Sequence, residues 1–203
     1  DTSGWTGPIS GTTSCDVIST FPFTEGFDLT SPTLGCWRNN YLVGVGNWGV
    51  AAGALGGAIT TPFFGAYNLV YVNPGGVNSP ITNAVSPTFD LTALTAPRVH
   101  FYYAQEEWFG DQNYTRLLYR AATSDPWTEI WSDSSNVDVW TKVTVQLPNP
   151  SATYQLAFQG INNNGRRNVV DEMTVEDTPA NDLSVTSVSA AGGFCGLGMD
   201  SIK

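Results

Sequence analysis

Aromatic and polar side chains gather in one short stretch, residues 105–114, which reads QEEWFGDQNY. An exposed aromatic ring can stack on a sugar face, while neighbouring amides, carboxylates or a guanidinium bond the sugar's hydroxyl groups. We therefore predict a shallow ligand site around Trp108. Its polar members are predicted to be Glu107, Asp111, Asn113 and Arg166. The remaining tryptophans of strand-like segments are interpreted as core residues: Trp37, Trp48, Trp131 and Trp140.

The same stretch contains two adjacent acids, Glu106 and Glu107. Glycosidases use a pair of such carboxyl groups in catalysis. Adjacent residues on a strand point to opposite faces, so these two cannot simply form a catalytic pair. The single histidine, His100, lies within a strand pattern and is interpreted as structural, which leaves a Ser–His–Asp triad without its base. One histidine and no paired-cysteine motif also fit zinc poorly. We predict that the chain is not an enzyme.

A second turn-like segment, residues 162–167, reads NNNGRR and predicts a hairpin. Its two arginines either contact an acidic ligand or balance the charge of Asp171, and the second interpretation is preferred. Asn113-Tyr114-Thr115 matches the N-glycosylation pattern, which matters only in a eukaryotic secretory host.

The composition restricts the partners. Eighteen acids against eight basic residues give the 203-residue chain a net charge of −10, which excludes a basic footprint for nucleic acid or anionic membranes. The least charged stretch, residues 42–59, contains six glycines and is too weakly apolar to span a bilayer. The chain opens without a signal peptide and is expected to be a mature or excised fragment. Few lysines and many Thr, Ser and Asn suggest a secreted or cell-surface protein.

Apolar side chains alternate with period two, as in strands with one buried face. Turn-forming residues bound each run. The predicted strands are residues 66–72, 99–103, 114–121, 128–131, 139–147, 154–158 and 169–175. Many short strands of this kind predict an all-β fold built as a two-sheet antiparallel sandwich.

The three cysteines leave their pairing open. Cys15 and Cys36 flank a short segment and can form a disulfide, with Cys195 bonding a partner beyond this chain. The alternative is three buried free thiols.

Several motifs occur in a definite order. They are residues 21–28 (FPFTEGFD), 35–37 (GCW), 86–91 (SPTFDL), 99–103, 140–147, 154–160 and 170–175 (VDEMTV). In this order the region from Cys15 to Asp177 resembles MAM-type jelly rolls, more closely the cleaved-adhesin and "choice-of-anchor J" modules of Bacteroidetes surface proteins. The resemblance implies a jelly-roll sandwich of the MAM or galactose-binding type. Two features depart from it: the module has two cysteines instead of four, and Glu172 replaces a second aspartate.

The resemblance also implies a metal site. In this fold the first and last strands tend to be neighbours, which brings Glu25 and Asp28 near Asp171. Calcium is bound by carboxylate and carbonyl oxygens. A structural Ca²⁺ held by these three, with Asp90 as a further ligand, is therefore expected. The alternative is that they are ordinary surface acids.

The domain organisation follows from a boundary near residues 177–181. Residues 1–14 are expected to form a linker or strand, 15–178 the jelly roll, and 179–203 a linker and the first strands of an incomplete immunoglobulin-like domain. A flexible tail is the alternative.

These expectations lead to a non-catalytic extracellular module of a larger protein, used for adhesion to glycan or protein ligands and stabilised by calcium. Two alternatives remain: a carbohydrate-binding module of a polysaccharide-degrading enzyme, and a structural subunit of an extracellular filament. The neighbouring domains of the parent chain would be its other partners.

Overall fold

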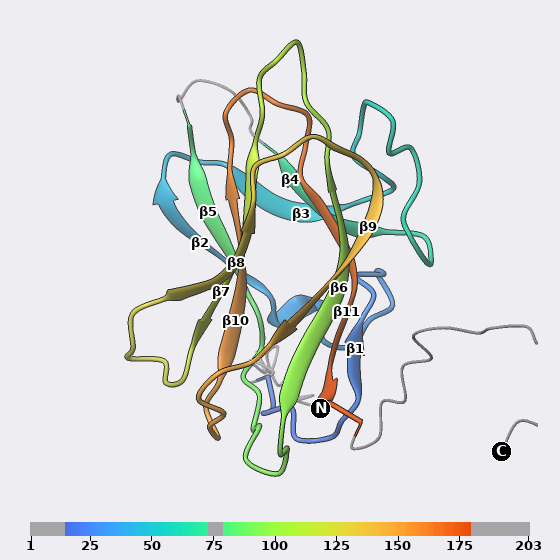
Figure 1. The fold of residues 1–203 in the computed structure, drawn as a ribbon. Coiled ribbons are helices and arrows are strands. Elements are labelled where there is room, and N and C mark those ends of the chain that lie inside the picture. Colours follow the sequence, from blue (N-terminus) through green and yellow to red (C-terminus); the bar gives the residue numbers. More distant parts are fainter. Residues whose placement is uncertain (1–14, 73–78, 180–203) are drawn as a thin grey trace, which may run out of the picture.

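Period-two alternation produces two antiparallel sheets in residues 15–72 and 79–179, the part of the chain that the computed structural model describes (Figure 1). The strands are β1 (Phe23–Glu25), β2 (Arg38–Val43), β3 (Asn47–Ala51), β4 (Asn68–Val72), β5 (Ile81–Val85), β6 (Pro97–Gln105), β7 (Tyr114–Arg120), β8 (Thr128–Asp133), β9 (Val137–Gln146), β10 (Gln155–Ile161) and β11 (Val169–Asp177). One sheet has the order β3-β4-β11-β6-β9, with β1 also beside β11, and the other has the order β2-β5-β10-β7-β8. The predicted two-sheet antiparallel sandwich is confirmed.

All seven predicted strands are present, with ends that differ by a few residues. Strands β2, β3 and β5 were not predicted, because asparagine and glycine interrupt their alternation. Their asparagines have structural partners. The side chain of Asn39 on β2 bonds both the main-chain N–H and the main-chain oxygen of Trp48 on β3, and so ties two strands of different sheets together.

Strand β11 changes its partner along one edge. It pairs with β4 at Val169 and Val170, and with β1 from Met173 to Val175. Between these segments β11 has one more residue than β6, and Glu172 adopts a left-handed φ of 47°. This is a β-bulge, which bends a strand and re-aims its side chains. The expected contact between the first and last strands is confirmed by the pairing of β1 with β11.

The main core lies between the sheets and is rich in aromatic rings. Phe158 is fully buried, stacks on Trp37 and meets Phe101 edge to face. Trp48 and Trp131 also belong to this core, as predicted.

Trp140 differs, because it packs in a second cluster with Ala54, Ile59, Val70, Ala104 and Val169. Since neighbours of the last three, such as Leu69 and Val170, face the main core, this cluster lies on the opposite face of the sheet. The loop between β3 and β4 covers that face.

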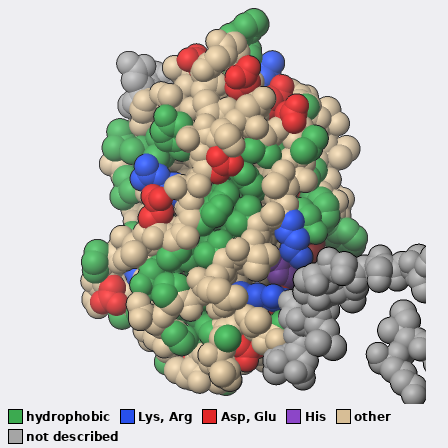
Figure 2. Space-filling view, in the orientation of Figure 1, with side chains coloured by type: hydrophobic (Ala, Val, Ile, Leu, Met, Phe, Trp, Pro, Cys, Tyr) green, Lys and Arg blue, Asp and Glu red, His purple; other side chains and the backbone are tan. Residues whose placement is uncertain are grey.

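One edge of the sandwich is not fully closed. Trp131, Val143 and Val145 pack against the core but stay partly exposed. They belong to β8 and β9, the end strands of the two sheets. Figure 2 shows hydrophobic side chains running diagonally across the middle of this view, where these two strands lie in Figure 1.

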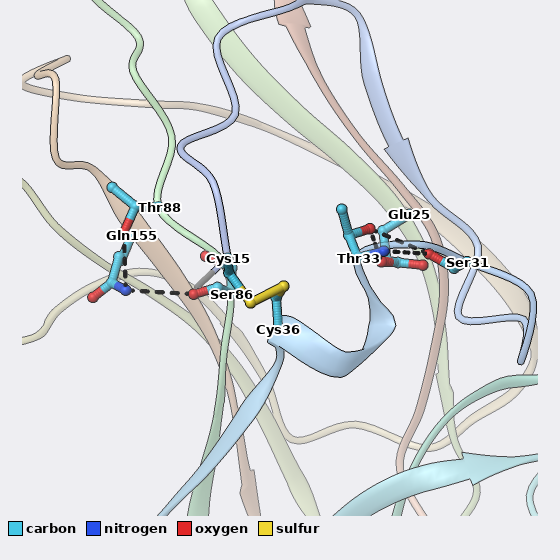
Figure 3. Close-up of a disulfide and its surroundings, with 8 residues drawn as sticks. All are labelled: Cys15, Glu25, Ser31, Thr33, Cys36, Ser86, Thr88 and Gln155. Carbon is cyan, nitrogen blue, oxygen red and sulfur yellow. Dashed lines mark hydrogen bonds between the residues drawn. A yellow bond between two sulfur atoms is a disulfide. The ribbon is translucent and has the colours of Figure 1, made fainter. Parts of the chain in front are cut away.

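A disulfide joins Cys15 to Cys36, with 5.7 Å between their Cα atoms (Figure 3). It ties the start of the described chain to the 3₁₀ turn Leu34–Cys36 and decides the pairing that the sequence left open. Cys195, the predicted N-terminal segment 1–14 and the immunoglobulin-like segment lie outside the described residues. Across residues 15–72 and 79–179, no helix has the length and apolarity needed to cross a membrane.

The aromatic core predicts a large effect for one substitution. Phe158→Ala should lower the free energy of unfolding by about 3–5 kcal/mol, because it removes a buried ring that two others contact. Val139→Ala is the control, since Val139 is 64% exposed, and should cost less than about 1 kcal/mol. Urea unfolding measures both. Equal losses in the two variants would contradict this assignment of the core.

Candidate functional site

Three loops meet at the upper end of the sandwich in Figure 1: residues 53–57 between β3 and β4, 106–113 between β6 and β7, and 162–168 between β10 and β11. The predicted hairpin at 162–167 is wrong. Strands β10 and β11 belong to different sheets, so this segment crosses from one sheet to the other.

Buried amide side chains hold these loops in place. The carboxamide of Asn113 donates to the main-chain oxygen of Arg166 (2.7 Å) and to Asn168 Oδ1 (3.0 Å). Its oxygen accepts the main-chain N–H groups of Asn163 (2.7 Å) and Gly165 (2.9 Å). Asn168 in turn donates to the hydroxyl of the fully buried Thr115 on β7. The network fixes the crossing loop against the β6–β7 loop.

Asn113 lines a pocket between these loops, but its side chain has a structural role, and its part in ligand binding stays a prediction. All of its hydrogen-bonding groups are used inside the protein, and only 2% of the residue is exposed. The same burial makes the glycosylation pattern at Asn113 inaccessible to a modifying enzyme.

A pocket of about 350 Å³ lies between the loops. Trp108, Arg166 and Leu55 line it, together with Tyr71 and Asn164. Trp108 is 46% exposed, which agrees with its predicted place outside the core. The guanidinium carbon of Arg166 lies 5.7 Å from the centre of the Trp108 ring, a cation–π arrangement. The structure thus brings three of the predicted ligand residues, Trp108, Asn113 and Arg166, together around one concavity.

Two other predicted ligand residues shape the turn instead of lining the pocket. Asp111 and Trp108 exchange main-chain hydrogen bonds of 2.9 and 3.0 Å. The main-chain N–H of Glu107 donates to Asn136 Oδ1. Sequence reasoning missed Tyr71, because a strand pattern does not show which buried ring borders a pocket.

The preferred interpretation of the arginine pair is also wrong. Arg167 donates to the main-chain oxygens of Ala54 and Leu55, and Arg166 lies against Trp108. Within the described residues, neither arginine forms an ion pair with Asp171.

A second group of functional interest surrounds the bulge of β11. Asp171 is fully buried and its Oδ2 accepts the main-chain N–H groups of Phe63 (2.9 Å) and Phe64 (3.1 Å). Its Oδ1 accepts the N–H of Glu172 (2.8 Å). The last of these bonds satisfies a main-chain N–H group of the bulge, and the first two fasten the β3–β4 loop to the sheet.

Two more acids complete this group. Asp28 Oδ1 accepts the N–H groups of Ala66 (2.8 Å) and Tyr67 (3.0 Å), farther along the same loop. The fully buried Glu25 accepts from the hydroxyl of Thr33 at 2.6 Å, as Figure 3 shows, and from the main-chain N–H of Phe27. We call Glu25, Asp28, Asp171 and Glu172 the acid cluster.

The acid cluster carries uncompensated negative charge. Burial raises the pKa of Asp171 to about 6, although the hydrogen bonds from Phe64, Glu172 and Phe63 oppose the shift. Burial, followed by the charges of Asp28 and Glu25, raises the pKa of Glu172. In the described part of the chain, no Lys or Arg forms an ion pair with any of the four acids.

The carboxylates of the acid cluster are hard oxygen donors with negative charge. Ca²⁺ binds ligands of this kind. Their present arrangement is less suited, since no three His, Cys, Asp or Glu side chains of residues 15–72 and 79–179 are placed to hold a metal ion. Several carboxylate oxygens are used on main-chain amides instead.

Asp90 shares no hydrogen-bonding partner with the acid cluster among the described residues, and its place in the expected ligand set stays a prediction. It accepts the main-chain N–H and the hydroxyl of Thr92 in a local turn, which lowers the pKa of Asp90. Its own main-chain N–H donates to the oxygen of Ile18.

His100 has the structural surroundings that were predicted. Its Nδ1 lies 3.4 Å from Glu176 on the neighbouring strand. Burial and the nearby charge of Lys142 lower the pKa of His100.

Comparison with known proteins supports the fold. No protein-family model matches the chain, and no curated protein matches its sequence. The K1 cleaved adhesin domain of Lys-gingipain from Porphyromonas gingivalis superposes with a TM-score of 0.60 at 15% identity, covering 78% of this chain and 99% of that domain. The K3 cleaved adhesin domain gives 0.54 at 14% identity, covering 76% and 98%.

A third similar structure is the C-terminal family 22 carbohydrate-binding module of Clostridium thermocellum Xyn10B, with a TM-score of 0.51 at 12% identity over 77% of this chain and 94% of that one. At these identities the likeness is one of fold. It confirms the jelly roll that the sequence resemblance implied.

The raised pKa of Asp171 predicts how stability varies with pH in metal-free buffer. The folded protein keeps this proton to higher pH than the unfolded chain, so the free energy of unfolding falls as pH rises from about 4 to about 6. Asp171 should therefore add about 1 kcal/mol at pH 5 relative to pH 7. His100 acts in the opposite direction, because its pKa is lowered.

The measurement is therefore the difference between the protein and Asp171→Asn in urea unfolding with EDTA at both pH values. The variant should lose the pH-dependent contribution of Asp171 to the free energy of unfolding, whereas the contribution of His100 should be the same in both proteins. Identical pH dependence in the two proteins would show that Asp171 is not buried as a carboxyl group with a raised pKa.

Proposed function

We propose that this chain is a non-catalytic extracellular binding module of a larger protein. We also propose that the pocket between the three loops, called the loop-end pocket below, binds part of a glycan. The observation that carries the proposal is the half-exposed Trp108 beside a pocket of about 350 Å³. Exposed indole rings are costly to leave in water and suit the apolar face of a pyranose. The buried amides around Asn113 keep the pocket preformed, which reduces the entropy lost on binding.

A non-catalytic role agrees with the placement of the acids. Glu106 accepts the main-chain N–H of Ala58, whereas Glu107 and Asp111 belong to the exposed turn. No Asp or Glu of the described residues lines the pocket, whereas a glycosidase requires two carboxyl groups at its site. The similarity in fold to a cleaved adhesin domain and to a xylan-binding domain also supports the proposal of a non-catalytic binding role.

A carbohydrate-binding module attached to a polysaccharide-degrading enzyme is the second candidate. It is favoured by the likeness to a xylan-binding domain of family 22, with a TM-score of 0.50 at 12% identity. Both candidates use the same pocket and differ in the parent protein.

We further propose that Ca²⁺ stabilises the module at the acid cluster. Asp28 Oδ2 and the carboxylate of Glu172 accept no hydrogen bond within the described residues, so they are the oxygens most available to a cation. A bound Ca²⁺ would supply the positive charge that the four acids lack. Its effect would be on the attachment of the β3–β4 loop, and through that loop on one wall of the pocket.

Removal of the indole tests the pocket. Trp108→Ala should abolish or reduce glycan binding at least tenfold without changing the melting temperature, because the ring lies outside the core. Screening on a glycan array, followed by titration of the strongest hit, measures the effect.

Trp127→Ala is the matched control, since this tryptophan packs on Arg120 beside the β7–β8 turn, at the opposite end of the sandwich. It should bind normally. Binding that survives Trp108→Ala would place the ligand elsewhere, and a protein that binds no glycan at all would reject the glycan-binding function.

Metal removal tests the calcium proposal. Calcium at about 100 times its Kd should add roughly 3 kcal/mol of stability over EDTA, which raises Tm by about 5–10 °C for a domain of this size. Asp28→Asn should reduce the gain. Asp90→Asn is the control and should keep it, since Asp90 lies in a separate turn. Equal melting with Ca²⁺ and EDTA would refute the proposal.

A further inference from the structure

We infer that the sugar held in the loop-end pocket carries a carboxylate and that Arg166 binds it; this inference rests on the proposed function. The Nε of Arg166 is buried and has no hydrogen-bond partner among the residues that the structure describes. An unpaired buried donor costs free energy, and native proteins keep few of them. A ligand that brings an acceptor into the pocket removes this cost.

Arg166 differs in this respect from Arg98 and Arg167. Arg98 forms an ion pair with Glu176 at 2.8 Å, and Arg167 donates to the main-chain oxygen of Leu55 at 2.5 Å. The guanidinium of Arg166 forms neither kind of contact with residues 15–72 or 79–179. In a protein of net charge −10, a cation without a counterion beside a pocket favours an anionic ligand group.

The neighbouring acids leave this charge uncompensated. Glu106, in the β6–β7 loop, accepts the main-chain N–H of Arg166 through its main-chain oxygen. Its carboxylate, however, accepts the main-chain N–H of Ala58 and forms no ion pair with Arg166. Glu107 and Asp111 do not line the pocket. Among the described residues, two charged side chains line the pocket, Arg166 and Arg167. Arg167 already donates to main-chain oxygens of Ala54 and Leu55, so the guanidinium of Arg166 is the one left for a ligand.

The positions of the two side chains specify the ligand group. Arginine presents Nε–H and Nη–H as a planar fork that matches the two oxygens of a carboxylate. Because the guanidinium carbon is 5.7 Å from the centre of the Trp108 ring, one monosaccharide can contact the indole beside Arg166 while its carboxylate meets the fork. A volume of about 350 Å³ is in the range of small-ligand sites.

The overall charge narrows the class further. A chain with eighteen acids repels dense polyanions such as nucleic acids or heavily sulfated glycans. The inferred ligand is therefore an isolated carboxylated sugar, such as a uronic acid, on an otherwise weakly charged glycan.

Two sugars that differ only in this group test the inference. Methyl β-D-glucuronide carries a carboxylate where methyl β-D-glucoside carries a hydroxymethyl group. Titrations are followed by NMR through the indole N–H of Trp108 and the Nε–H of Arg166. The glucuronide should shift both signals and bind at least tenfold more tightly. The Arg166→Gln variant should lose that advantage, whereas Arg38→Gln, a change of an exposed arginine on β2, should keep it.

Each other result has a distinct meaning. If the two sugars bind equally, and Arg166→Gln changes neither, the carboxylate inference is overturned while sugar binding at Trp108 stands. If the glucuronide binds but does not shift the Nε–H signal, Arg166 is not its partner and the inference is again overturned. If neither sugar shifts the Trp108 signal, and the glycan array is also negative, the proposed function fails together with the inference.

Discussion

The change of partner along β11 is the constraint on which the rest of this molecule depends. Since β4 covers one part of its edge and β1 another, the backbone between them loses its ladder bonds. The side chain of Asp171 lies at this point and accepts the N–H group of Glu172 on β11 and, from the β3–β4 loop, those of Phe63 and Phe64. The last two bonds hold the β3–β4 loop, which covers the outer face of the six-stranded sheet and also forms a wall of the pocket. One strand thus positions both groups of functional interest.

Two different physical devices fix the loops. At the pocket, neutral amides and a hydroxyl form a buried network around Asn113 and Asn168, and neutral partners add no charge that must be balanced. At the bulge, the carboxylates accept main-chain N–H groups, and their burial, followed by the charges of neighbouring acids, raises the pKa of Asp171 and Glu172. The first arrangement is complete in itself. The second leaves negative charge at buried groups with raised pKa values, so the stability of this region is expected to depend on pH; the proposed Ca²⁺ would neutralise that charge.

The sequence predicted much of the fold because burial of one sheet face enforces a period of two. Val99–Tyr103 on β6 is the clearest case, since its alternate residues Val99, Phe101 and Tyr103 all lie in the core. The pattern fails where the polar groups have tertiary partners. Asn39 on β2 looks like a turn residue, yet it joins two sheets. The bulge at Glu172 is also invisible to periodicity, although it allows Val170 and Met173 to face the core on either side of the acids.

For the site, the sequence alone determined the chemistry available: an exposed indole, a guanidinium and a set of acids, in a chain too acidic for nucleic acid. It placed Trp108 correctly, because a large ring in a polar turn has no sheet face to bury it. Only the tertiary structure decided which polar residues join that ring. It turned Asn113 inward, placed Asp90 in a local turn with Thr92 and brought Arg166 to Trp108 from 58 positions farther along the chain. Such contacts depend on which strands are neighbours, and short-range periodicity carries no information about that.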